Sequence, residues 1–257
     1  MRGQCLLEFD RLFWYLIANK KNKIYRKMIF NKKKLIDLVF SELSTCGASF
    51  VDCGGNWNVD GAYTFYALDR YKPVSAFLVD TNFTELSLNT ARRYNNLTLI
   101  NDNFAKKSIL SRIGKVDIVF FFDVLLHQVK PDWDEVLDMY SKIASRIVIH
   151  NPQYVASNKS IRLLDLGETE YFKNVPHTRK EPTYNALFDK MYEINTEHNR
   201  IWRDIHNVWQ WGITDSDLYK HMDKLGFSLK YSKNYGQSGP LENFENHGFL
   251  FQKNGLK

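Results

Sequence analysis

Cysteine is scarce in this chain, which has Cys5, Cys46 and Cys53 among 257 residues. An odd number of cysteines without a C-x-x-C pair argues against a disulfide framework and against a paired-cysteine zinc site. The sequence therefore predicts a reducing, cytoplasmic compartment and no metal. Long apolar runs are also lacking. Residues 13–18 fall far short of the roughly 20 that a membrane-spanning helix needs, and early acidic residues interrupt any secretory signal.

A strong excess of one charge is absent too, since 35 Lys and Arg against 29 Asp and Glu leave +6. Residues 1–31 are predicted to form an amphipathic, basic helical segment that packs on the core, covers a cofactor or contacts a membrane peripherally. Such charge suits an anionic partner, although a solvated helix face is the simpler interpretation. No nucleic-acid module accompanies it, which argues against nucleic acid. The excess lies mainly in Lys20, Lys21, Lys23, Arg26, Lys27, Lys32, Lys33 and Lys34.

Five short apolar runs alternate with helical patterns along the first 151 residues. This alternation predicts a doubly wound α/β fold with helices on both faces of a parallel sheet. Parallel strands of such a sheet bind ligands at their carboxyl ends, so the residues that end the runs should share one edge. These residues are Asp52, Asp80, Asn101-Asp102-Asn103, Asp123 and His150-Asn151.

A small-residue turn follows the first apolar run. Gly54 and Gly55 have no Cβ, so the backbone can turn sharply and approach a ligand closely. Asn56 tolerates left-handed backbone angles, and Trp57 stands beside it as a wall for a pocket or a cover for the sheet edge. We expect a strand-to-helix turn that binds a nucleotide-like group.

The strand and helix rhythm stops at Pro152 and resumes near residue 212. We interpret residues 152–212 as a helical or lid insertion without strands, placed after the fifth strand of a domain that spans residues 32–257. A helix, a strand, a turn-rich loop and a last strand then close the chain.

These ordered motifs resemble class I S-adenosylmethionine-dependent methyltransferases over roughly residues 33–151 and again from about residue 212. The resemblance implies a seven-stranded, mostly parallel sheet whose last strand is antiparallel, and S-adenosyl-L-methionine as the cofactor. It also implies that the glycine turn wraps the methionine moiety, that the second acid holds the ribose, and that the third tip binds adenine. The implied cofactor residues are Asp52, Gly54, Gly55, Asn56, Trp57, Asp80, Asp102, Asn103 and Asp123.

Asn56 and Asn58 depart from the commonest form of the family, which has glycines there. Asn at the first of these positions also occurs in a branch that methylates sugar hydroxyls. The resemblance therefore suggests oxygen methylation of a small-molecule or glycan acceptor.

Methyl transfer needs alignment and often a base, and it needs no metal in principle. His127 follows the Asp123 strand tip by four residues and is the first candidate base, because histidine titrates near physiological pH. A capping or packing histidine is the alternative. Asp123 could orient His127, contact the cofactor or form a turn. His150 and Asn151 end the fifth strand at the same rim and could contact the acceptor.

The insertion carries an aromatic and basic cluster that could bind substrate. Aromatic faces stack on sugars and planar rings, and arginines bind carboxylate or phosphate. An amphipathic helix that packs on the core is the alternative. The candidate substrate residues here are Arg200, Arg203, His206, Trp209 and Trp211.

Three other functions remain open at this stage. The basic segment permits a nucleic-acid methyltransferase or binding module. A nicotinamide-dependent oxidoreductase uses the same structural units, but G-x-G-x-x-G is missing. Asn56 and Asn58 also permit a non-catalytic scaffold. The oligomeric state and the methylated atom are undetermined.

Overall fold

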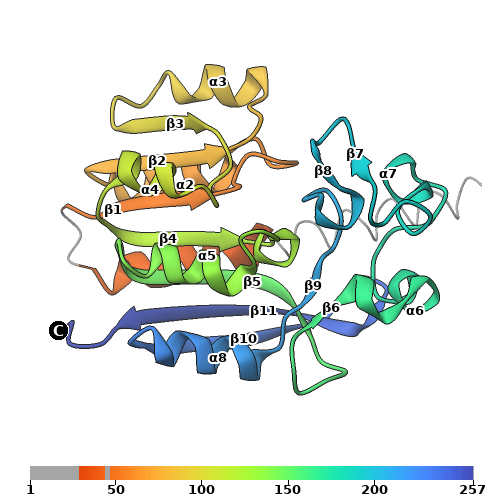
Figure 1. Cartoon of the computed structure of the whole chain (residues 1–257). Coiled ribbons are helices and arrows are strands. Elements are labelled where there is room, and N and C mark those ends of the chain that lie inside the picture. Colours follow the sequence, from red (N-terminus) through yellow and green to blue (C-terminus); the bar gives the residue numbers. More distant parts are fainter. Residues whose placement is uncertain (1–28, 44–46, 257) are drawn as a thin grey trace, which may run out of the picture.

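A computed structural model describes residues 29–43 and 47–256 (Figure 1). Seven strands form one sheet in the order β10-β11-β5-β4-β1-β2-β3. Strands β1 to β5 are parallel to one another, and β11 runs antiparallel to both β5 and β10. The predicted seven-stranded sheet with an antiparallel last strand is confirmed. The strands are β1 Ser49–Cys53, β2 Ser75–Asp80, β3 Leu97–Asn101, β4 Val116–Phe122, β5 Ala144–Tyr154, β10 Phe227–Ser238 and β11 Leu241–Lys253.

Helices cover both faces of the sheet. A helix over residues 29–41 packs with α2 and the segment after α3 on one face, and α4, α5 and α8 pack on the other. Side-chain caps begin several helices: Thr84 accepts from the Ser87 backbone N–H, and Asp132 forms a capping box with Glu135. The remaining bounds are α2 Ala62–Tyr71, α3 Glu85–Ala91, α4 Lys107–Ile113, α5 Trp133–Tyr140 and α8 Asp215–Lys224.

The basic segment proposed for residues 1–31 is described only from residue 29. Residues 1–28, and with them Cys5, as well as Cys46, lie outside the described residues. The helix over 29–41 crosses the predicted boundary at residue 31 without a break. No helix within 29–43 or 47–256 has the length and apolar character needed to cross a bilayer.

Strand β5 continues two residues past Pro152, where we expected the insertion to begin. Proline has no backbone N–H, so inside a sheet it removes a ladder bond. Here β4 has already ended, because its last residue, Phe122, lies opposite His150. The backbone nitrogen of Pro152 therefore points to the side of β5 where β4 is no longer present, so its missing N–H costs no hydrogen bond to β4. The backbone N–H of Tyr154, two residues on, bonds the Ile213 carbonyl instead.

The insertion is mixed rather than helical, so the expectation of a strand-free segment is wrong. Two short antiparallel pairs, β6–β9 and β7–β8, brace it. It has its own apolar core, which includes Tyr154 of β5 and Phe244 of β11. Its elements stand beyond the carboxyl ends of β4 and β5 in Figure 1. They are β6 Ile161–Arg162, η2 Leu163–Leu166, α6 Glu168–Lys173, α7 Pro182–Asn185, β7 Ile194–Asn195, β8 Arg200–Ile201, η3 Trp202–Asp204 and β9 Trp211–Gly212.

Replacing Phe120 tests the packing of the apolar core on one face of the sheet. Its ring is 1 % exposed and lies 5.5 Å from the Phe50 ring and 5.3 Å from the Phe122 ring. We expect Phe120→Ala to lower the free energy of unfolding by about 3–5 kcal/mol, measured by denaturant titration. Leu86→Ala, at a side chain that is 62 % exposed, should change it by less than about 0.5 kcal/mol. Equal losses in the two variants would contradict this core.

Candidate active site at the carboxyl edge of the sheet

The turn after β1 leaves no room for side chains at its two glycines. Gly54 has φ +73°, and a Cβ there would lie 2.7 Å from Val124 Cγ1 in the segment after β4. A Cβ on Gly55 would lie 2.3 Å from Asp52 Oδ2. Real Cβ atoms essentially never make contacts this short, so the turn accepts glycine at both positions and any side chain there would force a neighbour to move. It thereby brings the ends of β1 and β4 together.

Two buried oxygens beside this turn have no hydrogen-bond partner among the described residues. Asp52 Oδ2 accepts from the Thr64 hydroxyl at 2.7 Å, whereas Asp52 Oδ1 has no donor. Asn56 Nδ2 donates to the Asn82 carbonyl at 2.8 Å, whereas Asn56 Oδ1 has none. Buried acceptors are nearly always paired, so the turn calls for an additional donor.

Asp80, at the end of β2, faces the same turn. Its Oδ2 accepts from the backbone N–H of Asn56 at 2.8 Å and of Trp57 at 3.2 Å. Its Oδ1 has only a long contact of 3.4 Å with the Asn82 N–H. One carboxylate oxygen thus holds the turn, and the other has acceptor capacity left. Trp57 contributes its backbone N–H here, its side chain is 76 % exposed, and a role of that side chain in a pocket stays a prediction.

The third strand tip lies at the same edge and contacts the insertion. Asp102 forms an ion pair with Lys106 at 2.6 Å. The Asn103 backbone N–H donates to the Asp102 carboxylate at 2.7 Å. Asn103 Nδ2 meets His206 Nδ1 at 3.2 Å. The insertion is therefore joined to the loop that the resemblance assigns to adenine.

Asp123 directly follows β4 and lies in the left-handed region, with φ +58°. Its two oxygens contact different elements: Oδ2 lies 2.5 Å from Lys32 Nζ, and Oδ1 lies 2.8 Å from His150 Nδ1. Burial alone would raise the pKa of Asp123, but attraction from Lys32 and His150 outweighs it and holds that pKa below its ordinary value. Asp123 therefore contacts His150, and no hydrogen bond joins it to His127 among the described residues.

Sequence reasoning missed Lys32, which it counted only as part of a basic run. The side chain is 7 % exposed, and its ammonium also lies 5.2 Å from the centre of the Tyr63 ring. A signal was present, because Lys32 precedes Leu35 and Ile36 by three and four residues and so shares their buried helix face.

His127 lies in η1, Leu125–His127, and contacts the insertion. Its Nδ1 is 2.9 Å from the Val208 carbonyl, to which it donates, and its ring meets the Trp209 ring edge-on at 6.2 Å. Burial lowers the pKa of His127, although the bond to the carbonyl opposes this. The ring is thus neutral near pH 7, with a lone pair on Nε2.

The insertion is fastened along the segment that carries His127. The Gln210 N–H donates to the Leu126 carbonyl at 3.1 Å, and Trp211 Nε1 donates to the Gln128 carbonyl at 2.8 Å. The Val129 carbonyl accepts from Arg200 Nη1 at 3.1 Å. A run of bonds like this makes the insertion a fixed wall of the site.

The predicted substrate residues of the insertion are therefore engaged by protein. Arg203 pairs with Asp165 at 2.7 Å, and Arg200 Nη1 also meets His206 Nε2 at 2.9 Å. The rings of Trp209 and Phe244 pack edge to face. A role of these residues toward a substrate stays a prediction.

The side chains of His150 and Asn151 lie on opposite faces of the sheet. The two residues therefore do not line one site, although their neighbouring positions at the rim suggested it. Successive strand residues point to opposite faces. Gly248, paired with His150, lies against Leu35 of the helix over 29–41. His247, paired with Asn151, bonds Asp215 at the start of α8. Asn151 is buried on that second face.

The sequence matches no family model and no curated protein. Solved structures do match. A 1,6-didemethyltoxoflavin-N1-methyltransferase from Burkholderia thailandensis, with bound 1,6-didemethyltoxoflavin and S-adenosylhomocysteine, is 13% identical with a TM-score of 0.56, covering 97% of this chain and 88% of that one. The magnesium protoporphyrin IX methyltransferase of Synechocystis PCC 6803 with bound SAM is 12% identical with a TM-score of 0.53, covering 90% and 81%.

This chain has the class I methyltransferase fold. A mitomycin 7-O-methyltransferase shares it at 13% identity and a TM-score of 0.50, with 87% of this chain matched to 54% of that one. At such identities the likeness establishes the fold, and the activity has to be argued from the site.

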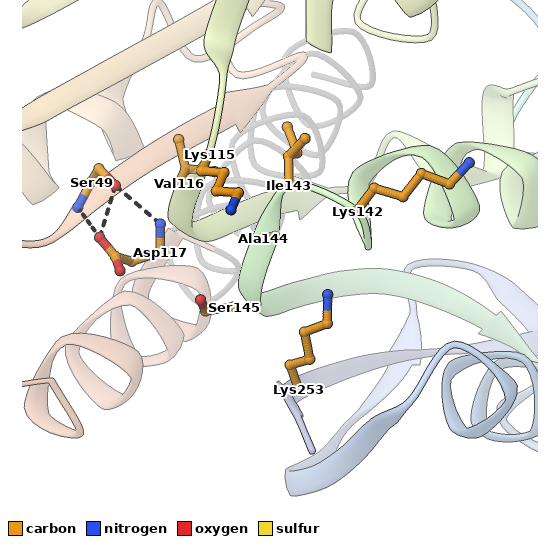
Figure 2. Close-up of a pocket in the computed structure, with 9 residues that line it drawn as sticks. All are labelled: Ser49, Lys115, Val116, Asp117, Lys142, Ile143, Ala144, Ser145 and Lys253. Carbon is orange, nitrogen blue, oxygen red and sulfur yellow. Dashed lines mark hydrogen bonds between the residues drawn. The ribbon is translucent and has the colours of Figure 1, made fainter. Parts of the chain in front are cut away.

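A cavity of about 460 Å³ lies at the opposite edge of the sheet (Figure 2). It opens at the amino ends of β1, β4 and β5, where Asp117 accepts from the Ser49 N–H at 2.7 Å. Three lysines surround it, Lys115, Lys142 and Lys253. Folds of this kind bind ligands at the carboxyl edge, so we do not assign the candidate active site to this cavity.

Asp52 makes stability depend on pH. Burial, aided by repulsion from Asp80, raises the pKa of Asp52 from 3.8 to about 7. A raised folded-state pKa stabilises the fold below the unfolded-state value, and this contribution is lost as pH rises through about 7. We expect Asp52→Asn to be more stable than the wild type at pH 8 by roughly 1–3 kcal/mol in cofactor-free denaturant titrations, and less so at pH 4. Glu242→Gln, at an exposed site, should change neither. The same difference at both pH values would argue against a neutral Asp52.

Proposed function

We propose that this protein is an S-adenosylmethionine-dependent methyltransferase that acts on a small-molecule acceptor. The observation that carries the proposal is the pair of unpartnered buried oxygens, Asp52 Oδ1 and Asn56 Oδ1, beside a turn that Asp80 also faces. The fold agrees with this reading, and the solved relatives named above are methyltransferases of small molecules by their own descriptions.

The residues present fit the chemical groups of this cofactor. Its ammonium group is a donor of the kind that the two orphaned oxygens lack. The remaining acceptor capacity of Asp80 suits a ribose diol, and the Asp102 and Asn103 tip suits adenine. When bound, S-adenosylmethionine supplies a methyl group on a positively charged sulfur.

The chain's own residues would then have two tasks, orientation and proton removal. The glycine turn and the insertion wall line up the reactants, which is the larger part of an in-line displacement. A hydroxyl acceptor must also lose a proton, and His127, a neutral ring with its lone pair on Nε2, is the candidate base at this edge. We therefore propose oxygen methylation. The resemblance of Asn56 to the sugar-methylating branch keeps a glycan among the acceptors to be tested.

Asp80→Asn tests the cofactor site. The amide keeps the size of the side chain but loses the charge that strengthens hydrogen bonds to a diol. We expect the affinity for S-adenosylhomocysteine, measured by calorimetry, to fall by about 10- to 100-fold, equivalent to about 1.4–2.7 kcal/mol.

Asp117→Asn is the matched control, because Asp117 stands at the amino end of β4, on the opposite edge. It should leave that affinity unchanged. Failure of the wild type to bind either form of the cofactor would overturn the proposed function. Transfer of a labelled methyl group to a panel of phenols, carboxylic acids and sugars then identifies the acceptor class.

A further inference from the structure

The cavity at the amino ends of β1, β4 and β5 has no part in the proposed methyl transfer (Figure 2). Its volume of about 460 Å³ lies within the range of small-molecule sites. It is separated from the turn after β1 by the length of the strands, so a ligand there would not touch the candidate active site. Charged and hydroxyl side chains contribute much of its lining, namely Lys115, Lys142, Lys253, Asp117, Ser49 and Ser145.

The three lysines of this cavity form no ion pair with a carboxylate among the described residues. Lys253 Nζ donates to the Ser141 carbonyl at 3.1 Å and lies 5.9 Å from the centre of the Phe227 ring, so it is held in place without being neutralised. Lys115 and Lys142 are exposed. Three ammonium groups without counter-ions around one cavity attract an anion. The lysines that do form ion pairs in this part of the chain are Lys32, Lys106, Lys130 and Lys173.

Asp117 is the acid of this lining, and Ser49 already engages it. The Asp117 Oδ2 accepts from the backbone N–H of Ser49 at 2.7 Å and from its hydroxyl at 2.8 Å. The carboxylate thus joins the starts of β1 and β4 instead of neutralising a lysine. Three positive charges against one negative charge leave the lining at +2. This excess matches a phosphate group, which carries roughly −1.5 to −2 at pH 7.

The kind of cation also favours a phosphate. Arginine presents a planar fork that suits a carboxylate, whereas each lysine is a point charge that can approach an oxyanion from its own direction. Lys115 and Lys253 extend toward residues 143–145 from different sides, and Lys142 points away from them (Figure 2). The Ser145 hydroxyl lines the same cavity and forms no hydrogen bond within residues 29–43 and 47–256, so it is a further donor.

The ends of two helices account for part of this charge. α4 ends at Ile113 and α5 at Tyr140, so Lys115 and Lys142 follow helix ends where a cation stabilises the helix dipole. Lys253 is the last residue of β11 and belongs to no helix. Helix stabilisation alone predicts that losing one of these lysines lowers the melting temperature and leaves the affinity for anions unchanged. The two explanations can therefore be separated by experiment.

We propose that this cavity binds the phosphate group of a small anion, either inorganic phosphate or a phosphate ester of a small molecule. Lys115, Lys253 and the Ser145 hydroxyl contact the phosphate oxygens, and Lys142 adds its charge at the opening. The cavity has room beyond one phosphate group, so the rest of an ester extends toward the open side. This inference is independent of the proposed function, because its residues take no part in binding the cofactor.

Amide NMR spectra of the full-length protein, recorded without cofactor, test the inference. The two probes are inorganic phosphate and glucose 6-phosphate, titrated at low ionic strength because salt screens exposed charges. Sodium chloride at equal ionic strength is the baseline. We expect saturable shifts confined to residues 115–117 and 143–145. Tighter binding of glucose 6-phosphate would support the inference and identify an ester, and equal binding would support it and identify free phosphate.

Variants of opposite charge effect make the test specific. Lys115→Met removes a positive charge and should weaken the affinity for phosphate by about 3- to 10-fold, and Lys142→Met should weaken it less. Asp117→Asn removes the negative charge and should tighten binding by a similar factor. Lys190→Met, at an exposed lysine of the insertion, is the matched control and should bind as the wild type does. The melting temperature shows whether each variant is folded.

Shifts that sodium chloride reproduces, or that arise mainly in residues 52–58, would overturn the inference. Unchanged affinity in a folded Lys115→Met would also overturn it and leave the helix dipole as the explanation. A short single-stranded DNA that shifts the same residues at lower concentration than either probe would assign this edge to a nucleic acid instead. Should Asp117→Asn not fold, the comparison of Lys115→Met with Lys190→Met decides the question. None of these failures affects cofactor binding, which is measured separately.

Discussion

Close packing at the turn after β1 is the constraint on which the site depends. A Cβ on Gly54 would clash with Val124, and a Cβ on Gly55 would clash with the Asp52 carboxyl, so a side chain at either position would force a neighbour to move. The first contact sets how near the end of β4 comes to the end of β1. The second places the Gly55 backbone directly against the Asp52 carboxyl, and the burial of that carboxyl raises its pKa. The two glycines therefore permit both the close approach of these strand ends and the close packing against Asp52.

The insertion gains its fixed position from polar contacts that sequence alone cannot reveal. Arg200 and Trp211 have the residue types of a binding surface, yet their nitrogens donate to the Val129 and Gln128 carbonyls. The Asp204 side chain is nearly buried and pairs with Arg162 of the insertion at 2.7 Å and with Lys130 of the loop after β4 at 2.5 Å. It thereby holds the same junction together. Unpaired carbonyls in the loop after β4 needed donors, and the insertion supplies them.

The sheet and its acidic tips were predictable because strand periodicity and turn residues are local signals, as the Asp52 and Asp80 tips illustrate. The partners of those tips were not, since they come from distant elements. Lys32 reaches Asp123 across 91 residues of sequence. His150 and Asn151 are adjacent in sequence, but strand geometry sends them to opposite faces. Proline at 152 suggested a strand end, and only the early end of β4 shows why it is tolerated.

Charge balance connects these observations. Three carboxyls, those of Asp52, Asp80 and Asp123, lie at the carboxyl ends of β1, β2 and β4. Among the described residues, the buried lysine at this edge is Lys32, and its ammonium is paired with Asp123. Burial, with repulsion from Asp80 added to it, raises the pKa of Asp52 to about 7, so this carboxyl is partly protonated near neutral pH. A ligand with two positive groups would balance the negative charge of these carboxyls and favour loss of the proton from Asp52. A sheet edge with these carboxyls favours cations, which agrees with the proposed cofactor, because S-adenosylmethionine carries both an ammonium and a sulfonium.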